Sequence, residues 1–252
     1  DISSLRGLSY CTNLRTLNIS GLHITDGTMN QIATLSYLQA LVARDCDLDN
    51  LADGGTPALR NAVGLEMLDL TNNNFTSLDS VFAEGVKYGS LREVYLSNNQ
   101  LTDIDALQRA PMVTYLSLEN NGLTTEGTAA IADYPYLRYL NLAKNHIDSV
   151  EHLTGLKYLR ELRLHHNELT DVRALRSMVD LEILYLGHNE IQDVGFLNTL
   201  TALQILYVND NDIRDISQLS GLTKLEAVNV SNNRISSLSV LRNYAGTLTE
   251  IY

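Results

Sequence analysis

The sequence predicts an α/β solenoid, in which short repeats form a right-handed coil. A curved parallel β-sheet is expected on the concave face, with 3-10 or short α-helices on the convex face. The prediction depends on two observations. The pattern L-x-x-L-x-L-x-x-N-x-[LI] recurs along almost the whole chain of 252 residues, and successive copies begin 22 to 27 residues apart. A unit of that length cannot bury its own apolar side, so it must stack on further copies of itself.

The repeat sets the expected boundaries of the domain. With the first leucine of the pattern as position one, that position recurs from Leu14 to Leu248. Ten repeats are complete and partial repeats stand at both ends, which predicts one domain over residues 1–252. Partial repeats expose apolar edges, so we expect either end-to-end association or flanking domains that cap those edges.

Each repeat is expected to contain one short strand. The stretch x-L-x-L alternates with period two, which directs its two leucines into the interior. Side chains at positions three and five then face solvent on the concave side. Successive strands pair in parallel, at a spacing of roughly 4.8 Å.

Position nine is asparagine in most repeats. The residues are Asn73, Asn99, Asn121, Asn145, Asn167, Asn189, Asn211 and Asn233. A buried amide there can satisfy backbone groups of two neighbouring turns, so we interpret these asparagines as structural. Leu22 and Cys46 hold this position in the first two repeats. We expect Cys46 to be a buried, unreactive thiol that is too far from Cys11 for a disulfide.

The segment after each strand returns across the convex side. It reads [IL]-x-D-[IV]-x-x-L-x-x-L, with Asp103, Asp171, Asp193 and Asp215 before the next buried residue. An acidic side chain at that place can cap the N–H groups of a 3-10 or α turn. The longer repeats carry insertions, and we expect a fuller helix over residues 125–132 and similar segments over 52–63 and 77–88.

These residues resemble the leucine-rich repeat superfamily over essentially the whole chain. The 22-residue repeats, such as residues 211–222, are most similar to those of two groups. One is the bacterial internalins and related surface proteins, and the other is the short-repeat regulatory subunit of protein phosphatase 1. The longer repeats are similar to bacterial or ribonuclease-inhibitor-like variants with convex helices. The resemblance implies a scaffold that binds a partner on a broad surface.

Composition and motifs argue against several other functions. The net charge is −12, whereas nucleic acids and anionic membranes require a cationic surface. The apolar runs are too short to span a membrane. The sequence has no P-loop, no G-x-S-x-G elbow, no H-E-x-x-H and no dinucleotide motif. We therefore predict that the protein is not an enzyme and uses no cofactor.

Aromatic residues gather at the concave positions of the central repeats, where the interior does not require them. Tyrosine and arginine commonly anchor protein interfaces. The predicted partner-binding residues are Tyr95, Tyr115, Tyr139, Arg163, His165, Ile183, Tyr185 and Tyr207. Arg138, Lys144 and Arg160 add a local surplus of cations, which favours a partner of acidic character. The opposing interpretation is that tyrosine enters strands because of its high β-propensity alone.

Two histidines at equivalent positions of adjacent repeats raise the question of a metal site. His166 and His188 share position eight of adjacent repeats, and Asp210 continues the column. Two imidazoles and a carboxylate could hold zinc. Polar residues are also ordinary at an exposed edge, and we predict no metal. The acidic string at residues 45–49 lacks the glycine and final glutamate of a calcium loop, and the asparagine column accounts for the string at 209–212.

The function predicted from the sequence is protein recognition through the concave face. The expected setting is a bacterial surface or secreted module of the adhesin type, extracellular or on the cell surface. One alternative is a cytoplasmic regulatory scaffold that docks on an enzyme such as a phosphatase. Another is a rigid spacer between flanking domains, in which the concave tyrosines have no role.

Overall fold

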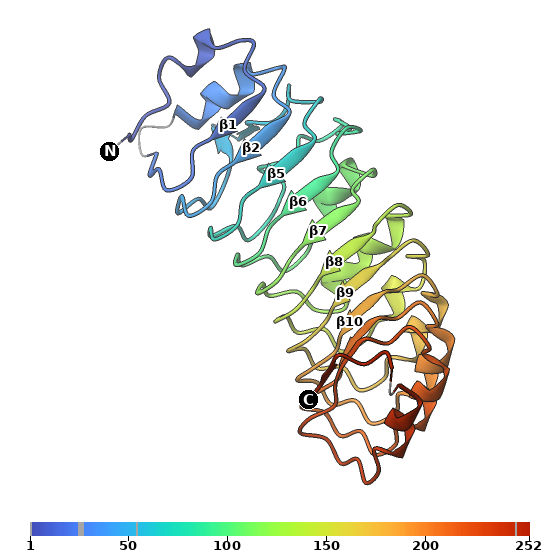
Figure 1. Cartoon of the computed structure of the whole chain (residues 1–252). Helices are drawn as coiled ribbons and strands as arrows, with labels where there is room; N and C mark the ends of the chain where they lie inside the picture. Colours follow the sequence, from blue (N-terminus) through green and yellow to red (C-terminus); the bar gives the residue numbers. More distant parts are fainter. Residues whose placement is uncertain (1, 25–27, 54, 245) are drawn as a thin grey trace. The chain divides into compact units, whose positions relative to one another are not determined.

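The alternating leucines of the repeats form short strands in this computed structural model, which describes residues 2–24, 28–53, 55–244 and 246–252. The chain divides into two units, Asp1–Tyr134 and Pro135–Tyr252. Within each unit the repeat strands pair in parallel and follow one another in sequence order (Figure 1). The predicted solenoid of stacked repeats is confirmed for each unit. The single domain over residues 1–252 stays a prediction.

The sheet of the first unit has the order β1-β2-β5-β6-β7. Its strands are β1 (Thr16–Asn18), β2 (Ala40–Val42), β5 (Met67–Asp69), β6 (Glu93–Tyr95) and β7 (Tyr115–Ser117). The register pairs equivalent positions, so Leu41 lies opposite Leu17 on one side and Leu68 on the other. Each of these leucines is buried, and together they form a continuous inner row.

The opposite side of the first unit is irregular. Its 3-10 helices are η1 (Leu8–Tyr10), η2 (Thr28–Thr34), η3 (Asp105–Arg109) and η4 (Glu126–Asp133). The fuller helix expected over residues 125–132 is the 3-10 helix η4.

The helical expectation is wrong for residues 52–63. They contain the antiparallel ribbon β3 (Ala52–Asp53) and β4 (Thr56–Pro57). Gly55 has φ of +79°, in the left-handed region that a tight turn needs and a helix excludes.

Residues 77–88 form turns instead of the expected helix. Gly85 has φ of +74°, which a helix does not allow. Phe82 and Tyr88 turn inward and pack edge to face, with ring centroids 5.1 Å apart. The Tyr88 hydroxyl accepts a hydrogen bond from the Ala83 N–H at 3.0 Å and donates one to the Leu59 carbonyl at 3.3 Å. The insertion is therefore held by buried aromatic rings together with isolated turns, such as the one closed by the Phe82 N–H and the Leu78 carbonyl at 3.1 Å.

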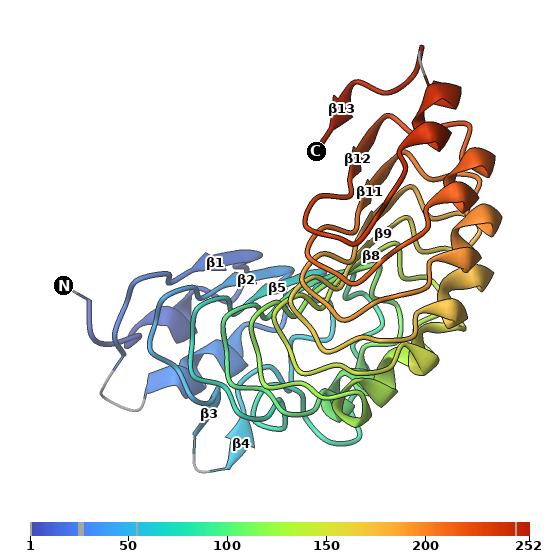
Figure 2. The same ribbon diagram turned by 90° about the horizontal axis from the view of Figure 1, so that it is seen from below.

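The second unit is regular on both sides. Its strands are β8 (Tyr139–Asn141), β9 (Glu161–Arg163), β10 (Ile183–Tyr185), β11 (Ile205–Tyr207), β12 (Ala227–Asn229) and β13 (Glu250–Ile251). Its 3-10 helices are η5 (Glu151–Leu153), η6 (Arg173–Ser177), η7 (Gly195–Thr199), η8 (Ser217–Gly221) and η9 (Ser239–Tyr244). Figure 2 shows the helices of this unit on the side away from its strands. Buried residues recur every three positions from Ile191 to Leu200, which matches the 3.0 residues per turn of a 3-10 helix.

Aspartates stand two residues before several of the 3-10 helices and accept hydrogen bonds from their first N–H groups, as predicted. The side chains of Asp171, Asp193 and Asp215 each accept a hydrogen bond from the N–H two residues later, at 2.9, 2.7 and 2.8 Å. Asp103 does the same at 3.4 Å. The side-chain and backbone hydrogen bonds from Arg173 lower the pKa of Asp171 to about 2. The carboxylates thus satisfy N–H groups that a short helix leaves without partners.

The position-nine asparagines join one repeat to the next. The Asn211 carbonyl oxygen accepts from the Ile191 N–H at 2.9 Å. Its amide donates to the carbonyls of Leu186 at 3.0 Å and Val208 at 3.1 Å. Asn189 repeats the pattern with equivalent groups. The structural interpretation of these asparagines is confirmed.

Cys46 takes the same place in the second repeat. Its Sγ lies 3.1 Å from the Ile19 carbonyl oxygen and 3.2 Å from that of Arg44. Burial raises the pKa of the thiol, which keeps it protonated and a poor nucleophile. Cys11 and Cys46 are both free thiols, as expected.

Candidate protein-binding surface

The sheet of the second unit carries a row of aromatic rings on its outer face, which we call the aromatic row. Tyr185 and Tyr207 meet edge to face with ring centroids 5.1 Å apart, and Tyr252 lies 6.4 Å beyond Tyr207. Tyr185 and Tyr207 are half-buried, whereas Tyr252 is exposed. The row thus presents its rings to solvent, while the leucines of the same strands face the interior.

Arg163 extends the row between two tyrosines. Its guanidinium carbon lies 5.7 Å from the ring centre of Tyr139 and 5.1 Å from that of Tyr185. Its Nε donates to the Glu161 carboxylate at 2.7 Å. Burial is the largest single influence on the pKa of Arg163 and lowers it, but the hydrogen bond to Glu161 and the charges of Glu161, Tyr139 and Tyr185 together outweigh burial, so the pKa is raised. The guanidinium is therefore charged and held in place by two ring faces and one carboxylate.

A shallow hollow of about 320 Å³ opens beside the row. Its lining comes from the ends of three neighbouring strands and the turns that follow them. The lining residues are Arg163, His165, His166, Tyr185, Gly187, His188, Tyr207 and Asn209. The ring of His165 lies 6.2 Å from that of Tyr185 and 5.7 Å from that of His166. The hollow thus joins the aromatic row to the histidines of position eight.

Position eight has a left-handed backbone in both units. Lys144, His166, His188, Asp210 and Asn232 have φ between 51° and 56° in the second unit. L-residues adopt this region at a cost that glycine, asparagine and aspartate bear best. The turn therefore explains why so many repeats have those residues at this position.

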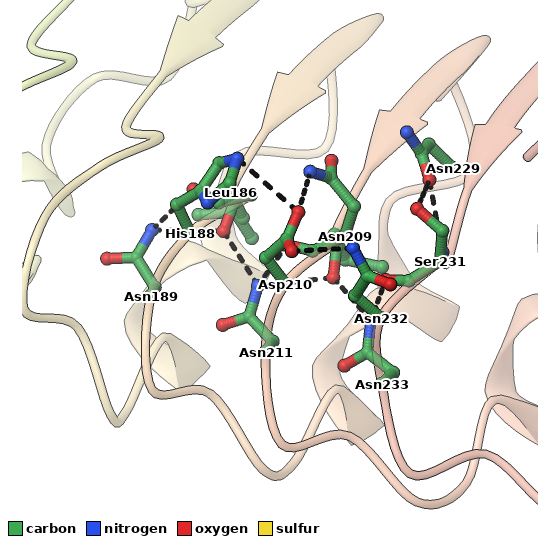
Figure 3. Close-up of polar contacts among 12 residues, drawn as sticks. Leu186, His188, Asn189, Asn209, Asp210, Asn211, Asn229, Ser231, Asn232 and Asn233 are labelled. Atoms are coloured by element: carbon green, nitrogen blue, oxygen red, sulfur yellow. Dashed lines mark hydrogen bonds and ion pairs between the residues drawn. The ribbon is translucent and has the colours of Figure 1, made fainter.

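The two position-eight histidines stack on each other. Their rings lie parallel, with centroids 4.0 Å apart and planes 8° from each other. His188 Nε2 lies 3.3 Å from Asp210 Oδ2. Asp210 also accepts from the amides of Asn209 at 2.7 Å and Asn232 at 2.8 Å, and these hydrogen bonds lower its pKa (Figure 3). Among the described residues, His166, His188 and Asp210 are not a group whose ligand atoms converge within 4.8 Å.

The remaining predicted tyrosines, Tyr95 and Tyr115, belong to the first unit. Tyr95 and Tyr115 lie with ring centroids 4.9 Å apart, inclined by 38°. The Tyr95 hydroxyl donates to Glu93 at 3.1 Å. Burial first, and then the hydrogen bond to Glu93, raise the pKa of Tyr95 to about 12. Asp69, which is fully buried, also contributes to that rise. The pair therefore has acidic neighbours.

The structure joins the predicted residues of the second unit into one surface. Tyr139, Arg163, Tyr185 and Tyr207 form the row, and His165 borders it. Ile183 is half-buried between Glu161 and Ile205 in the strand register.

Position five is not uniformly exposed, contrary to the sequence interpretation. Asp69, Ser117 and Asn141 are buried there. Tyr252 is a member of the row that sequence reasoning did not select, although it holds position five. Gly187 and Asn209 also line the hollow. Nothing in the sequence, apart from their place in the repeat register, indicated this.

Family models match most of this repeat region. The model for leucine rich repeat matches residues 63–123, 111–169 and 135–191, and a model for two copies of the repeat matches 201–243. The chain belongs to the leucine-rich repeat family. A comparison with curated protein sequences found no match.

Solved structures of leucine-rich repeat proteins share the fold. Internalin InlF of Listeria monocytogenes is 23% identical with a TM-score of 0.78, over 100% of this chain and 84% of that one. Internalin C2 of the same species is 29% identical with a TM-score of 0.59, over 69% and 81%. The plant peptide hormone receptor RGFR1 in complex with RGF2 is 17% identical with a TM-score of 0.69, over 90% and 37%. The repeats are thus internalin-like, as the sequence indicated.

Proposed function

We propose that this leucine-rich repeat protein recognises another protein through its sheet face, without catalysis, and that the aromatic row of the second unit is the principal contact. The observation that carries the proposal is Arg163 held between the rings of Tyr139 and Tyr185. These side chains face outward and pack no interior, yet they are ordered by one another. Rigid aromatic and arginine groups of this kind dominate the energy of protein interfaces.

The similar structures support a binding role outside the cell. Internalins are among them, and the receptor RGFR1 is seen in complex with RGF2. Within the described chain, no helix has the length and apolar character needed to cross a membrane. An adhesin-type module of a bacterial surface or secreted protein is the setting that we propose for this chain.

Affinity capture followed by direct binding measurement tests the proposal. A partner captured from host-cell extract is purified, and its Kd is measured for the wild type and for Tyr139→Ala/Tyr185→Ala/Tyr207→Ala. We expect at least about 100-fold weaker binding, because truncation of interface tyrosines commonly costs 1 kcal/mol or more each.

A matched variant controls for the loss of tyrosine as such. Tyr136 and Tyr158 lie in the turns before β8 and β9 and are 50% and 57% exposed. Tyr136→Ala/Tyr158→Ala should bind as the wild type does. Equal binding by the row variant, with an unchanged circular dichroism spectrum, would contradict the proposed surface. A larger loss of affinity from Tyr95→Ala/Tyr115→Ala would place the principal binding surface on the first unit.

A further inference from the structure

The hollow beside the aromatic row differs in charge from the rest of the protein. The whole chain has a net charge of −12. The residues that line the hollow include Arg163 and three histidines but no carboxylate. The remaining polar groups are the tyrosine hydroxyls and the Asn209 amide. The lining of the hollow therefore offers one arginine, with imidazole, hydroxyl and amide groups beside it and aromatic walls.

Two carboxylates that contact lining residues of the hollow are already engaged. Glu161 accepts from Arg163 Nε at 2.7 Å. Asp210 is held by the amides of Asn209 and Asn232 and by His188 (Figure 3). Glu161 uses only the Nε side of the guanidinium, so the terminal nitrogens of Arg163 can still donate to an anion. The side chain is 37% exposed, which gives a ligand access to it.

A glycine keeps the floor of the hollow open. A Cβ added at Gly187 would lie 2.7 Å from the Asn209 side-chain oxygen, closer than such atoms approach. The Asn209 amide nitrogen is bound to Asp210 at 2.7 Å, which limits how far this side chain can retreat. A larger residue at position 187 would therefore fill the space between His165 and Asn209. The opening depends on this one small residue.

We infer that the hollow receives the carboxylate of an aspartate or glutamate side chain from an acidic segment of the protein partner. This inference rests on the proposed function and identifies the chemistry of the partner. Arg163 would bind the carboxylate through its terminal nitrogens, because a guanidinium already fixed by two rings loses little freedom on binding. The aromatic row beside it would cover the apolar part of the same segment.

Nuclear magnetic resonance with short peptides tests the inference. The probes are the capped peptides Gly-Asp-Gly-Asp-Gly and Gly-Asn-Gly-Asn-Gly, with sodium acetate and inorganic phosphate as separate titrants. The signals followed are the imidazoles of His165, His166 and His188 and the Nε–H of Arg163. We expect the aspartate peptide to shift these signals saturably at millimolar concentration. The asparagine peptide should bind about tenfold more weakly, which corresponds to about 1.4 kcal/mol.

Two arginine variants make the assignment specific. Arg163→Gln should weaken binding of the aspartate peptide at least about tenfold, because it removes the charged donor of the hydrogen bonds to the carboxylate. Arg173→Gln changes an exposed arginine on the helix side and should have no effect. Circular dichroism confirms that both variants fold.

Several outcomes would overturn the inference. They are equal response to the two peptides, no shift with either, or normal binding of the aspartate peptide by Arg163→Gln. Phosphate that binds as tightly as the aspartate peptide would show a general anion site instead. If the peptide fails while the row variant still loses the protein partner, only the carboxylate inference is wrong. If the row variant keeps the partner, the proposed function is wrong whatever the peptide does.

Discussion

Position eight carries a chain of amides in the first unit, whereas two stacked imidazoles occupy it in the second. In the first unit Asn72 donates to Asp45 at 2.8 Å, Asn98 to Asn72 at 2.7 Å and Asn120 to Asn98 at 2.8 Å. In the second unit His166 and His188 stack at 4.0 Å. The backbone is left-handed in both columns. The turn therefore requires a left-handed backbone at position eight. It leaves the side chain free to form either amide hydrogen bonds or a ring stack.

Two ion pairs, one from each unit, show how burial changes the role of a charge. The first unit holds the ion pair of Arg44 and Asp69, in which Nε donates to the carboxylate at 2.6 Å and the Asp69 side chain is 1% exposed. In the second unit the pair of Arg173 and Asp171 lies on the surface, with both side chains more than half exposed. A buried charge depends on its partner far more than an exposed one does.

The largest effect is expected from the asparagine column. Asn211→Ala leaves the Ile191 N–H without its acceptor and removes one of the two amide donors at each of the Leu186 and Val208 carbonyls, so we expect a loss of about 3 kcal/mol in the free energy of unfolding. Cys46→Ala, at the equivalent place in the first unit, should cost about 1 kcal/mol because the thiol is a weak donor. Urea unfolding monitored by circular dichroism measures both. Similar costs for the two would show that the column stabilises the units through packing alone.

The second-largest change in the free energy of unfolding is expected from the ion pairs. Arg44→Ala leaves the buried Asp69 carboxylate with the Thr71 N–H at 3.1 Å but without its cation. We expect a loss of about 2 kcal/mol in the free energy of unfolding. Arg173→Ala in the second unit should produce no measurable change, because that pair is exposed to solvent. The same urea experiment compares them, and equal losses would contradict the distinction drawn between the units.

Exchange of the position-eight residues should have the smallest effect. His166→Asn/His188→Asn would place amides where the first unit has them, and asparagine tolerates the left-handed region better than histidine does. We expect a gain of about 1 kcal/mol in the free energy of unfolding. The reverse change, Asn98→His, breaks two amide hydrogen bonds and should cost a similar amount. If both changes destabilise, the imidazole stack is a stability element in its own right.

The sequence by itself determined the strands, their register, the asparagine column and the aspartate caps. These follow from the repeat, because equivalent positions meet the same groups in the repeat before and after them. Leu41, Asn211 and Asp171 lie where the pattern predicts. The sequence left 3-10 and short α-helices open for the segments after the strands, and the structure has 3-10 helices there, such as η7.

Only the tertiary structure decided the irregular segments and the binding surface. Residues 52–63 contain a ribbon and 77–88 form turns, because glycines with positive φ and inward-facing aromatic rings outweighed helix propensity. Arg163 pairs with Tyr185 in the strand register, as the repeat predicts, but its contact with Tyr139 joins position five of one repeat to position three of the repeat before. Such contacts depend on the rotamer of each side chain and on neighbours about 22 residues away, which a repeat pattern does not specify.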